Sequence, residues 1–158
     1  MKKALVLTNG LYQTSDAKTA HGLVRGSERF LIAGIIDNTQ TANKDAGELL
    51  DSTHRNIPVF ADLAAALSTI KDADTLIIGV ATVGGKLPVE MLVIIKEAIS
   101  KGLSIVNGLH DYLNEHADLV ELALKNNSIL IDIRKPKKRE DLHFFTGDIF
   151  NIKTPIVA

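Results

Sequence analysis

The chain has 158 residues, a length that suits one domain built around a single hydrophobic core. Its 18 basic and 19 acidic side chains give a net charge of −1, and its apolar runs are short, so neither a nucleic-acid partner nor a membrane-spanning segment is expected. The absence of cysteine excludes disulfides, zinc–thiolate sites and a cysteine nucleophile, and it suits a cytoplasmic protein.

Short apolar runs rich in β-branched residues recur along the chain, and such runs are typical of strands buried on both faces of a parallel sheet. They cover residues 3–8, 29–37, 57–61, 75–81, 103–108 and 128–133. Segments with helical spacing lie between them, at residues 17–25, 44–51, 62–70, 88–101 and 111–127. Asp62 suits an N-cap, Pro88 suits a first helical position and Gly102 suits the left-handed residue after a helix.

This strict alternation predicts an α/β fold of the Rossmann-like type, a three-layer sandwich with a parallel sheet of strand order 3-2-1-4-5-6. The pattern stops after Ile133. We therefore expect a Rossmann-like domain over residues 1–135. Residues 136–158 are expected to form a linker and the start of a strand that leads to a further domain. The basic run at residues 134–140 is interpreted as part of that solvated linker.

Ligands of open α/β sheets bind beyond the carboxyl ends of the strands, where the strand order reverses. The residues expected at this edge are Thr8, Asn9 and Gly10 after the first strand, Asp37 after the second, Thr82, Gly84, Gly85 and Lys86 after the fourth, and Asn107, Gly108 and His110 after the fifth.

Two of these groups allow more than one interpretation. Asp37 stands where an acid binds a ribose hydroxyl in dinucleotide-binding proteins, yet G-x-G-x-x-G is absent and acids at strand ends also form caps and turns. The run Gly84-Gly85-Lys86 lacks the spacing and hydroxyl of a Walker loop. It could bind an anion through its amides and the lysine, or be a simple glycine turn.

The five histidines show no metal-ligand spacing, so no metal site is predicted. His110 could act as an acid or base with the neighbouring Asp111, which could equally be the N-cap of the next helix. His21 lies on the polar face of the first predicted helix and is either a second proton-transfer candidate or a solvated residue.

Five segments occur in a characteristic order and spacing: DAKTAHGLVR (16–25), IIDNTQTANKDAGELLD (35–51), GVATVGGKLP (79–88), GLSIVNGLHDYL (102–113) and IDIRKP (131–136). In these segments the chain resembles the N-terminal Rossmann-like domain of the family called domain of unknown function 1611, also described as D-glutamate N-acetyltransferase-like. One departure is Thr82-Val83, where a proline or small residue is expected before the glycine pair.

The resemblance implies a two-domain enzyme whose C-terminal P-loop-like domain follows this chain, with acetyl transfer from acetyl-CoA to an acidic D-amino acid. We accordingly expect a small anionic ligand, with acetyl-CoA or a nucleotide as the cofactor, and a homo-oligomer. Two alternatives stay open: a non-catalytic scaffold or dimerisation domain, and an NAD(P)-dependent oxidoreductase.

Overall fold

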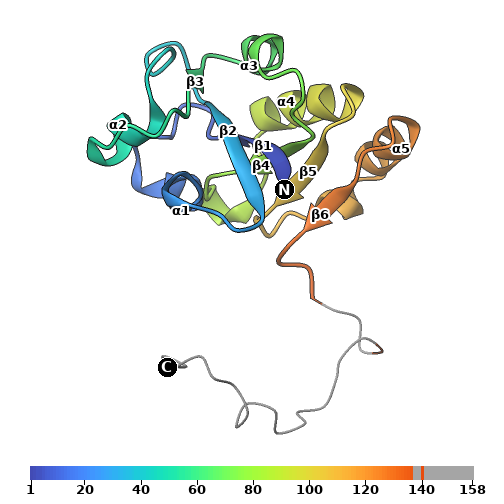
Figure 1. Cartoon of the computed structure of the whole chain (residues 1–158). Helices are drawn as coiled ribbons and strands as arrows, with labels where there is room; N and C mark the ends of the chain where they lie inside the picture. Colours follow the sequence, from blue (N-terminus) through green and yellow to red (C-terminus); the bar gives the residue numbers. More distant parts are fainter. Residues whose placement is uncertain (137–139, 141–158) are drawn as a thin grey trace, which may run out of the picture.

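The computed structural model describes residues 1–136 and 140, and within them six strands form one parallel sheet (Figure 1). The strand order is β3-β2-β1-β4-β5-β6, which confirms the predicted Rossmann-like topology. The strands are β1 (Lys2–Leu7), β2 (Phe30–Ile36), β3 (Val59–Phe60), β4 (Thr75–Ile78), β5 (Ser104–Asn107) and β6 (Leu130–Asp132). The order reverses between β1 and β4, so the loops after these strands flank the edge where ligands are expected.

The connecting helices lie on both faces of the sheet, with α1 and α2 on one face and α3, α4 and α5 on the other (Figure 1). They are α1 (Lys18–Arg25), α2 (Ala46–Asp51), α3 (Leu63–Thr69), α4 (Val89–Ser100) and α5 (Ala117–Lys125), with short 3-10 turns η1 (Ser15–Ala17), η2 (Val83–Gly85) and η3 (Leu113–Glu115). The Asp62 side chain caps α3 by accepting a hydrogen bond from the Ala65 amide, as predicted. Gly102 has φ +83°, the left-handed conformation expected after α4.

Two helix predictions were wrong in detail. The single helix expected at residues 111–127 is divided into η3 and α5, because Asp132 accepts hydrogen bonds from the Leu113 and Asn114 amides and holds that turn against β6. Pro88 is the N-cap of α4, with extended backbone, and the helix begins one residue later. The predicted linker and further strand at residues 136–158 lie outside the described residues apart from Pro136 and Glu140.

The contact between α1 and the sheet depends on a glycine. A Cβ atom at Gly79 would lie 2.4 Å from Cγ1 of Val6 and 2.9 Å from Cβ of Ala20. Its carbonyl accepts a hydrogen bond of 2.9 Å from the Ala20 amide, in the first turn of α1. The loop after β4 therefore packs against the first turn of α1 and takes up one of its amides. In a standard Rossmann fold a dinucleotide pyrophosphate binds at this place.

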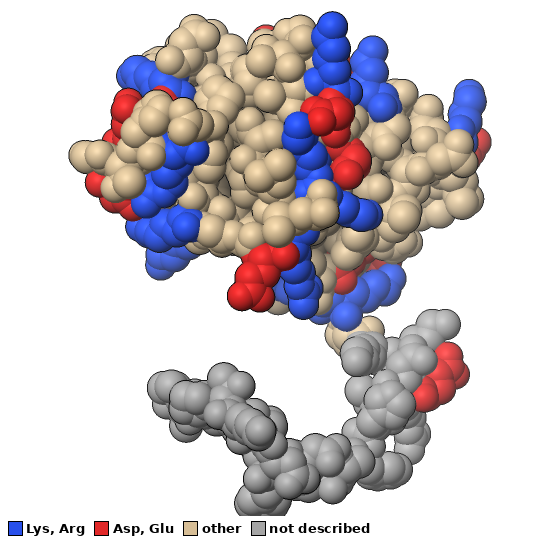
Figure 2. Space-filling model, in the orientation of Figure 1, with Lys and Arg blue, Asp and Glu red and all other residues tan. Residues whose placement is uncertain are grey.

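One apolar row crosses the α1 face of the sheet and is exposed only at its β6 end. Val6, Ile77, Val106 and Ile131 are in register across β1, β4, β5 and β6, and Ile131 is 38% exposed. Positive and negative side chains are interspersed on the face seen in Figure 2. None of the helices among the described residues is long and apolar enough to cross a membrane.

Candidate functional site

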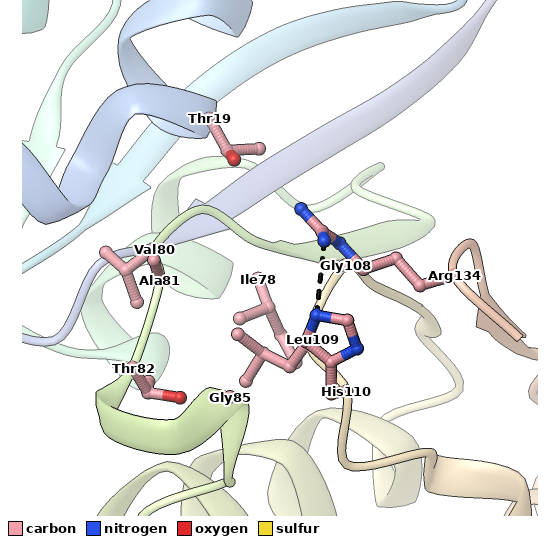
Figure 3. Close-up of a pocket in the computed structure, with 10 residues that line it drawn as sticks. All are labelled: Thr19, Ile78, Val80, Ala81, Thr82, Gly85, Gly108, Leu109, His110 and Arg134. Carbon is pink, nitrogen blue, oxygen red and sulfur yellow. Dashed lines mark hydrogen bonds between the residues drawn. The ribbon is translucent and has the colours of Figure 1, made fainter.

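A cavity of about 240 Å³ lies at the carboxyl ends of β4 and β5, the edge at which the sequence placed its candidates (Figure 3). Buried Ile78 and Val80 form its apolar part. Its lining also includes Thr19, Ala81, Thr82, Gly85, Gly108, Leu109, His110 and Arg134. Of the predicted site residues, Thr82, Gly85, Gly108 and His110 are thus brought together in one hollow.

The polar side of this cavity is made by an arginine and a histidine. Nη1 of Arg134 lies 3.3 Å from Nε2 of His110, and Figure 3 shows the two side chains next to each other, joined by this contact. A guanidinium can only donate, so Nε2 is the acceptor in this contact and holds its lone pair. No carboxylate among the described residues forms an ion pair with Arg134. Its charge is therefore available to a ligand.

The glycine pair shapes the loop after β4 and sets the position of His110. Gly84 and Gly85 both adopt left-handed backbone, at φ +65° and +67°. A Cβ atom at Gly85 would lie 3.0 Å from Cδ2 of His110, whereas one at Gly84 would meet nothing within 4 Å. The Gly85 amide donates to the Thr82 carbonyl at 2.9 Å. This amide is therefore used inside the loop and is not available to the anion that the sequence led us to expect.

Asp111 holds the two loops of the cavity together. Its amide donates to the Gly85 carbonyl at 3.0 Å, and its carboxylate accepts from the Leu87 amide at 3.0 Å and contacts Nε2 of His116 at 2.7 Å. The Leu87 amide, followed by His116, lowers the pKa of the Asp111 carboxyl. Asp111 is thus neither the N-cap of α5 nor a partner of the His110 ring; its histidine partner is His116.

Asn107 has a structural role at the end of β5. Its side chain is buried and donates to the Asp111 carbonyl and to Oδ1 of Asp132, both at 2.8 Å. Its own Oδ1 accepts from the Leu109 amide at 2.9 Å. Because every polar atom of this amide is used, Asn107 fixes the loop that carries His110 rather than facing a ligand.

The residues after β1 and β2 form a closed network around Asp37, which is only 5% exposed. Oδ1 accepts from the Thr8 hydroxyl at 2.7 Å, the Gly10 amide at 2.8 Å and the Tyr12 amide at 3.0 Å. Oδ2 accepts from the Thr41 hydroxyl at 2.7 Å. These bonds favour the turn-forming interpretation of Asp37 over ribose binding.

Three further predicted residues lie away from the cavity. Asn9 takes a left-handed conformation, φ 49°, in the loop that Asp37 holds. Nε2 of His21 lies 2.6 Å from the Tyr12 carbonyl, so this nitrogen carries a proton and His21 serves the loop. Lys86 is exposed and lines a second hollow on the other side of the loop after β4.

Sequence reasoning missed Arg134 as a site residue, because it opens a basic run that was interpreted as solvated linker. The signal was present: Arg134 follows β6 within two residues, and the carboxyl ends of parallel strands meet at one edge. Thr19 was not predicted from its position in the fold; it entered only as part of the family segment at residues 16–25. Within the described residues no group of three or more histidine, aspartate or glutamate side chains is arranged to hold a metal ion.

Comparison with known proteins gives one family and several relatives. The family model described as a domain of unknown function (DUF1611_N), Rossmann-like domain, matches residues 39–136. A crystal structure of a DUF1611 family protein from Anabaena variabilis superposes with a TM-score of 0.75 and 29% identity, over 86% of this chain and 37% of that one. D-galactose-1-dehydrogenase from Rhizobium etli shares the fold, with a TM-score of 0.52 and 13% identity over 80% of this chain and 35% of that one.

Two curated relatives are named D-glutamate N-acetyltransferase. The protein from a Pseudoalteromonas species is 48% identical over 64 residues, and the one from Tritonibacter scottomollicae is 38% identical over 64 residues. In both cases the match spans 40% of this chain and 19% of the relative. The matched segment thus corresponds to about a fifth of the length of these relatives.

Proposed function

Because the chain belongs to the DUF1611_N family of Rossmann-like domains, we propose that its cavity binds the carboxylate of an acidic amino acid in a two-domain N-acetyltransferase. The observation that supports this most is the Arg134 guanidinium, which lies at the cavity beside the His110 ring and forms no ion pair with a described carboxylate. Arginine presents a fork of N–H donors that matches a carboxylate in a bidentate contact.

The size of the cavity argues for a small ligand. Pockets that enclose drug-sized molecules have volumes of roughly 300–1,000 Å³, and this one has about 240 Å³. An amino acid suits that volume better than a whole nucleotide or coenzyme A. A further domain, of the P-loop-like type expected from the sequence, would supply the remaining wall of the site.

His110 is the residue of this chain that could take the acceptor's proton. In the proposed reaction the amine nitrogen attacks the carbonyl carbon of the acetyl thioester, the N–C bond forms and the C–S bond breaks. The nitrogen loses a proton to the base, and the departing thiolate takes up a proton. A substrate carboxylate that draws the Arg134 guanidinium to itself would release Nε2 of His110 from its present contact and leave its lone pair free.

The oxidoreductase alternative has less support in this chain. The likeness to D-galactose-1-dehydrogenase is one of fold, at 13% identity. Both oxygens of the Asp37 carboxylate accept hydrogen bonds from its own loop region. The Ala20 amide, at the start of α1, donates to the Gly79 carbonyl. Both features on which a standard dinucleotide site depends are thus engaged by the protein itself.

Calorimetric titration of the 158-residue chain with D-glutamate tests the proposal. Arg134→Ala should weaken binding roughly tenfold or more, the loss expected for a charge-assisted hydrogen bond. Arg29→Ala is the matched control, since Arg29 is an exposed arginine next to the start of β2, at the opposite edge of the sheet. Equal affinities for wild type and Arg134→Ala would refute the carboxylate site.

A further inference from the structure

The loop after β4 separates two hollows. On one side lies the cavity of Arg134 and His110. On the other lies a groove of about 400 Å³, which we call the outer groove, lined by Leu11, Asp16, Val83, Lys86, Leu87 and Pro88. Ala81 and Thr82 line both hollows, so a ligand in the cavity and a ligand in the outer groove would meet at these two residues.

The outer groove lies at the topological switch point. Leu11 comes from the loop after β1, and the other residues around Lys86 come from the loop after β4, the two neighbouring strands between which the order reverses. Ligands of open α/β sheets are expected there. Its volume falls within the roughly 300–1,000 Å³ range of ligand pockets, unlike that of the inner cavity.

The side chains of the groove define a chemical class of ligand. Most of them are apolar, including Val83, which is 98% exposed at the tip of the loop. Lys86 provides a cation, and Asp16 and Thr82 provide hydrogen-bond acceptors and a hydroxyl. The complementary molecule is an elongated, mainly apolar arm with amide N–H donors along it and an anionic group near the lysine.

The loop that forms this wall is held in shape by its own contacts. The Thr82 hydroxyl donates to the Lys86 carbonyl, and the Gly85 amide donates to the Thr82 carbonyl at 2.9 Å. The base of the groove is fixed by the Leu87 amide, which donates to the Asp111 carboxylate. The groove therefore exists before any ligand arrives, which lowers the entropic cost of binding.

We infer that the outer groove binds the phosphopantetheine-type arm of an acyl thioester, with Lys86 near its phosphate and the thioester end at Ala81 and Thr82. This inference rests on the proposed function, in which the inner cavity holds the acceptor amine. A donor in the groove and an acceptor in the cavity would meet across Thr82, and holding two reactants side by side is itself a large part of catalysis. Lys86 thus keeps the anion-binding role expected from the sequence, but in a different hollow from His110.

The test is calorimetric titration of the chain with coenzyme A. Lys86→Ala should weaken coenzyme A binding roughly tenfold, as expected for one charge-assisted hydrogen bond, and Val83→Asp should weaken it by placing a like charge at the groove. Both residues are exposed, so both variants should fold. Lys101→Ala is the matched control, because Lys101 is an exposed lysine at the opposite end of α4.

Titrations with D-glutamate separate this inference from the proposed function. Lys86→Ala should leave D-glutamate affinity unchanged, and Arg134→Ala should leave coenzyme A affinity unchanged. The inference is overturned if coenzyme A does not bind at millimolar concentration, or binds wild type, Lys86→Ala and Val83→Asp equally well. If Arg134→Ala bound D-glutamate as tightly as wild type while Lys86→Ala still weakened coenzyme A binding, only the acceptor site would be refuted.

Discussion

Asp37 illustrates how one buried carboxylate can organise a loop. Replacing it by alanine leaves the Thr8 and Thr41 hydroxyls and the Gly10 and Tyr12 amides without their acceptor. We expect Asp37→Ala to lower the free energy of unfolding by about 3 kcal/mol or more, measured by urea denaturation.

Asp37→Asn is the matched variant. Its amide oxygen can still accept the three hydrogen bonds that Oδ1 receives, so it should cost only about 1 kcal/mol. If both substitutions were equally mild, the network would contribute little, and Asp37 would again be a candidate for ligand binding.

The glycine pair offers a second comparison between neighbours. Alanine at either position is strained by about 1–2 kcal/mol, because both residues have left-handed backbone. Only at Gly85 would the added Cβ press on the His110 ring. Gly85→Ala should therefore shift the imidazole NMR signals of His110 and weaken D-glutamate binding, while Gly84→Ala should do neither. Identical spectra for the two variants would contradict the close contact.

The residues of the site were only partly predictable, and the reason is physical. The position of Gly85 and His110 at the carboxyl edge follows from strand order alone. The partner of each polar group depends on side-chain direction after a turn. The sequence offered His110 or an N-cap role for Asp111, and neither is its contact in the fold, which is His116. Arg134 was overlooked because charge runs are usually solvated. Only the fold places it beside the loop after β5 that carries His110.

At the scale of elements, hydrogen bonds to Asp111 predict a dependence of stability on pH. The folded pKa of Asp111 lies below its ordinary value of 3.8, first because of the Leu87 amide and then because of His116. A lowered pKa stabilises the fold above the ordinary pKa, and this contribution is lost as the pH falls through the folded value. Asp111→Asn should therefore destabilise the protein by about 1 kcal/mol at pH 7 and have little effect near pH 2.

Denaturation curves at the two pH values measure this difference. Asp16→Asn is the control, because it makes the same chemical change at an exposed carboxylate whose oxygens accept no hydrogen bond within the described chain. It should change the free energy of unfolding by less than about 0.5 kcal/mol. An Asp111→Asn effect of the same size at pH 2 and pH 7 would show that the loss is one of packing rather than of charge.

The elements themselves were easier to predict than the contacts between them. Buried parallel strands such as β1 and β4 show as continuous apolar runs because both of their faces are covered. The division of the last predicted helix into η3 and α5 could not be foreseen, since it depends on Asp132, a residue of the following strand that captures the Leu113 and Asn114 amides.

At the scale of the whole molecule, the topology leaves part of the sheet open. A right-handed crossover places α1 and α2 over one half of their face, while α3, α4 and α5 lie on the opposite face (Figure 1). Ile129, Ile131 and Ile133 alternate along β6 and its flanks, so they point to the same side, and they are 56%, 38% and 66% exposed. A hollow of about 620 Å³ adjoins them, with Phe30, Val106 and Ile131 in its apolar part and the charged residues Lys2, Arg29 and Asp74 also in its lining.

The three exposed isoleucines at β6 should bind a hydrophobic fluorescent dye, since contiguous exposed apolar surface is what such dyes recognise. The double variant Ile129→Thr/Ile133→Thr keeps β-branched side chains on both flanks of β6 and should reduce dye fluorescence while changing the free energy of unfolding by less than about 0.5 kcal/mol per site. Leu124→Thr is the control, because Leu124 is 75% exposed but lies on α5, away from this row, and its loss should leave the fluorescence unchanged. Equal dye binding by wild type and the double variant would mean that the isoleucine row is covered in solution.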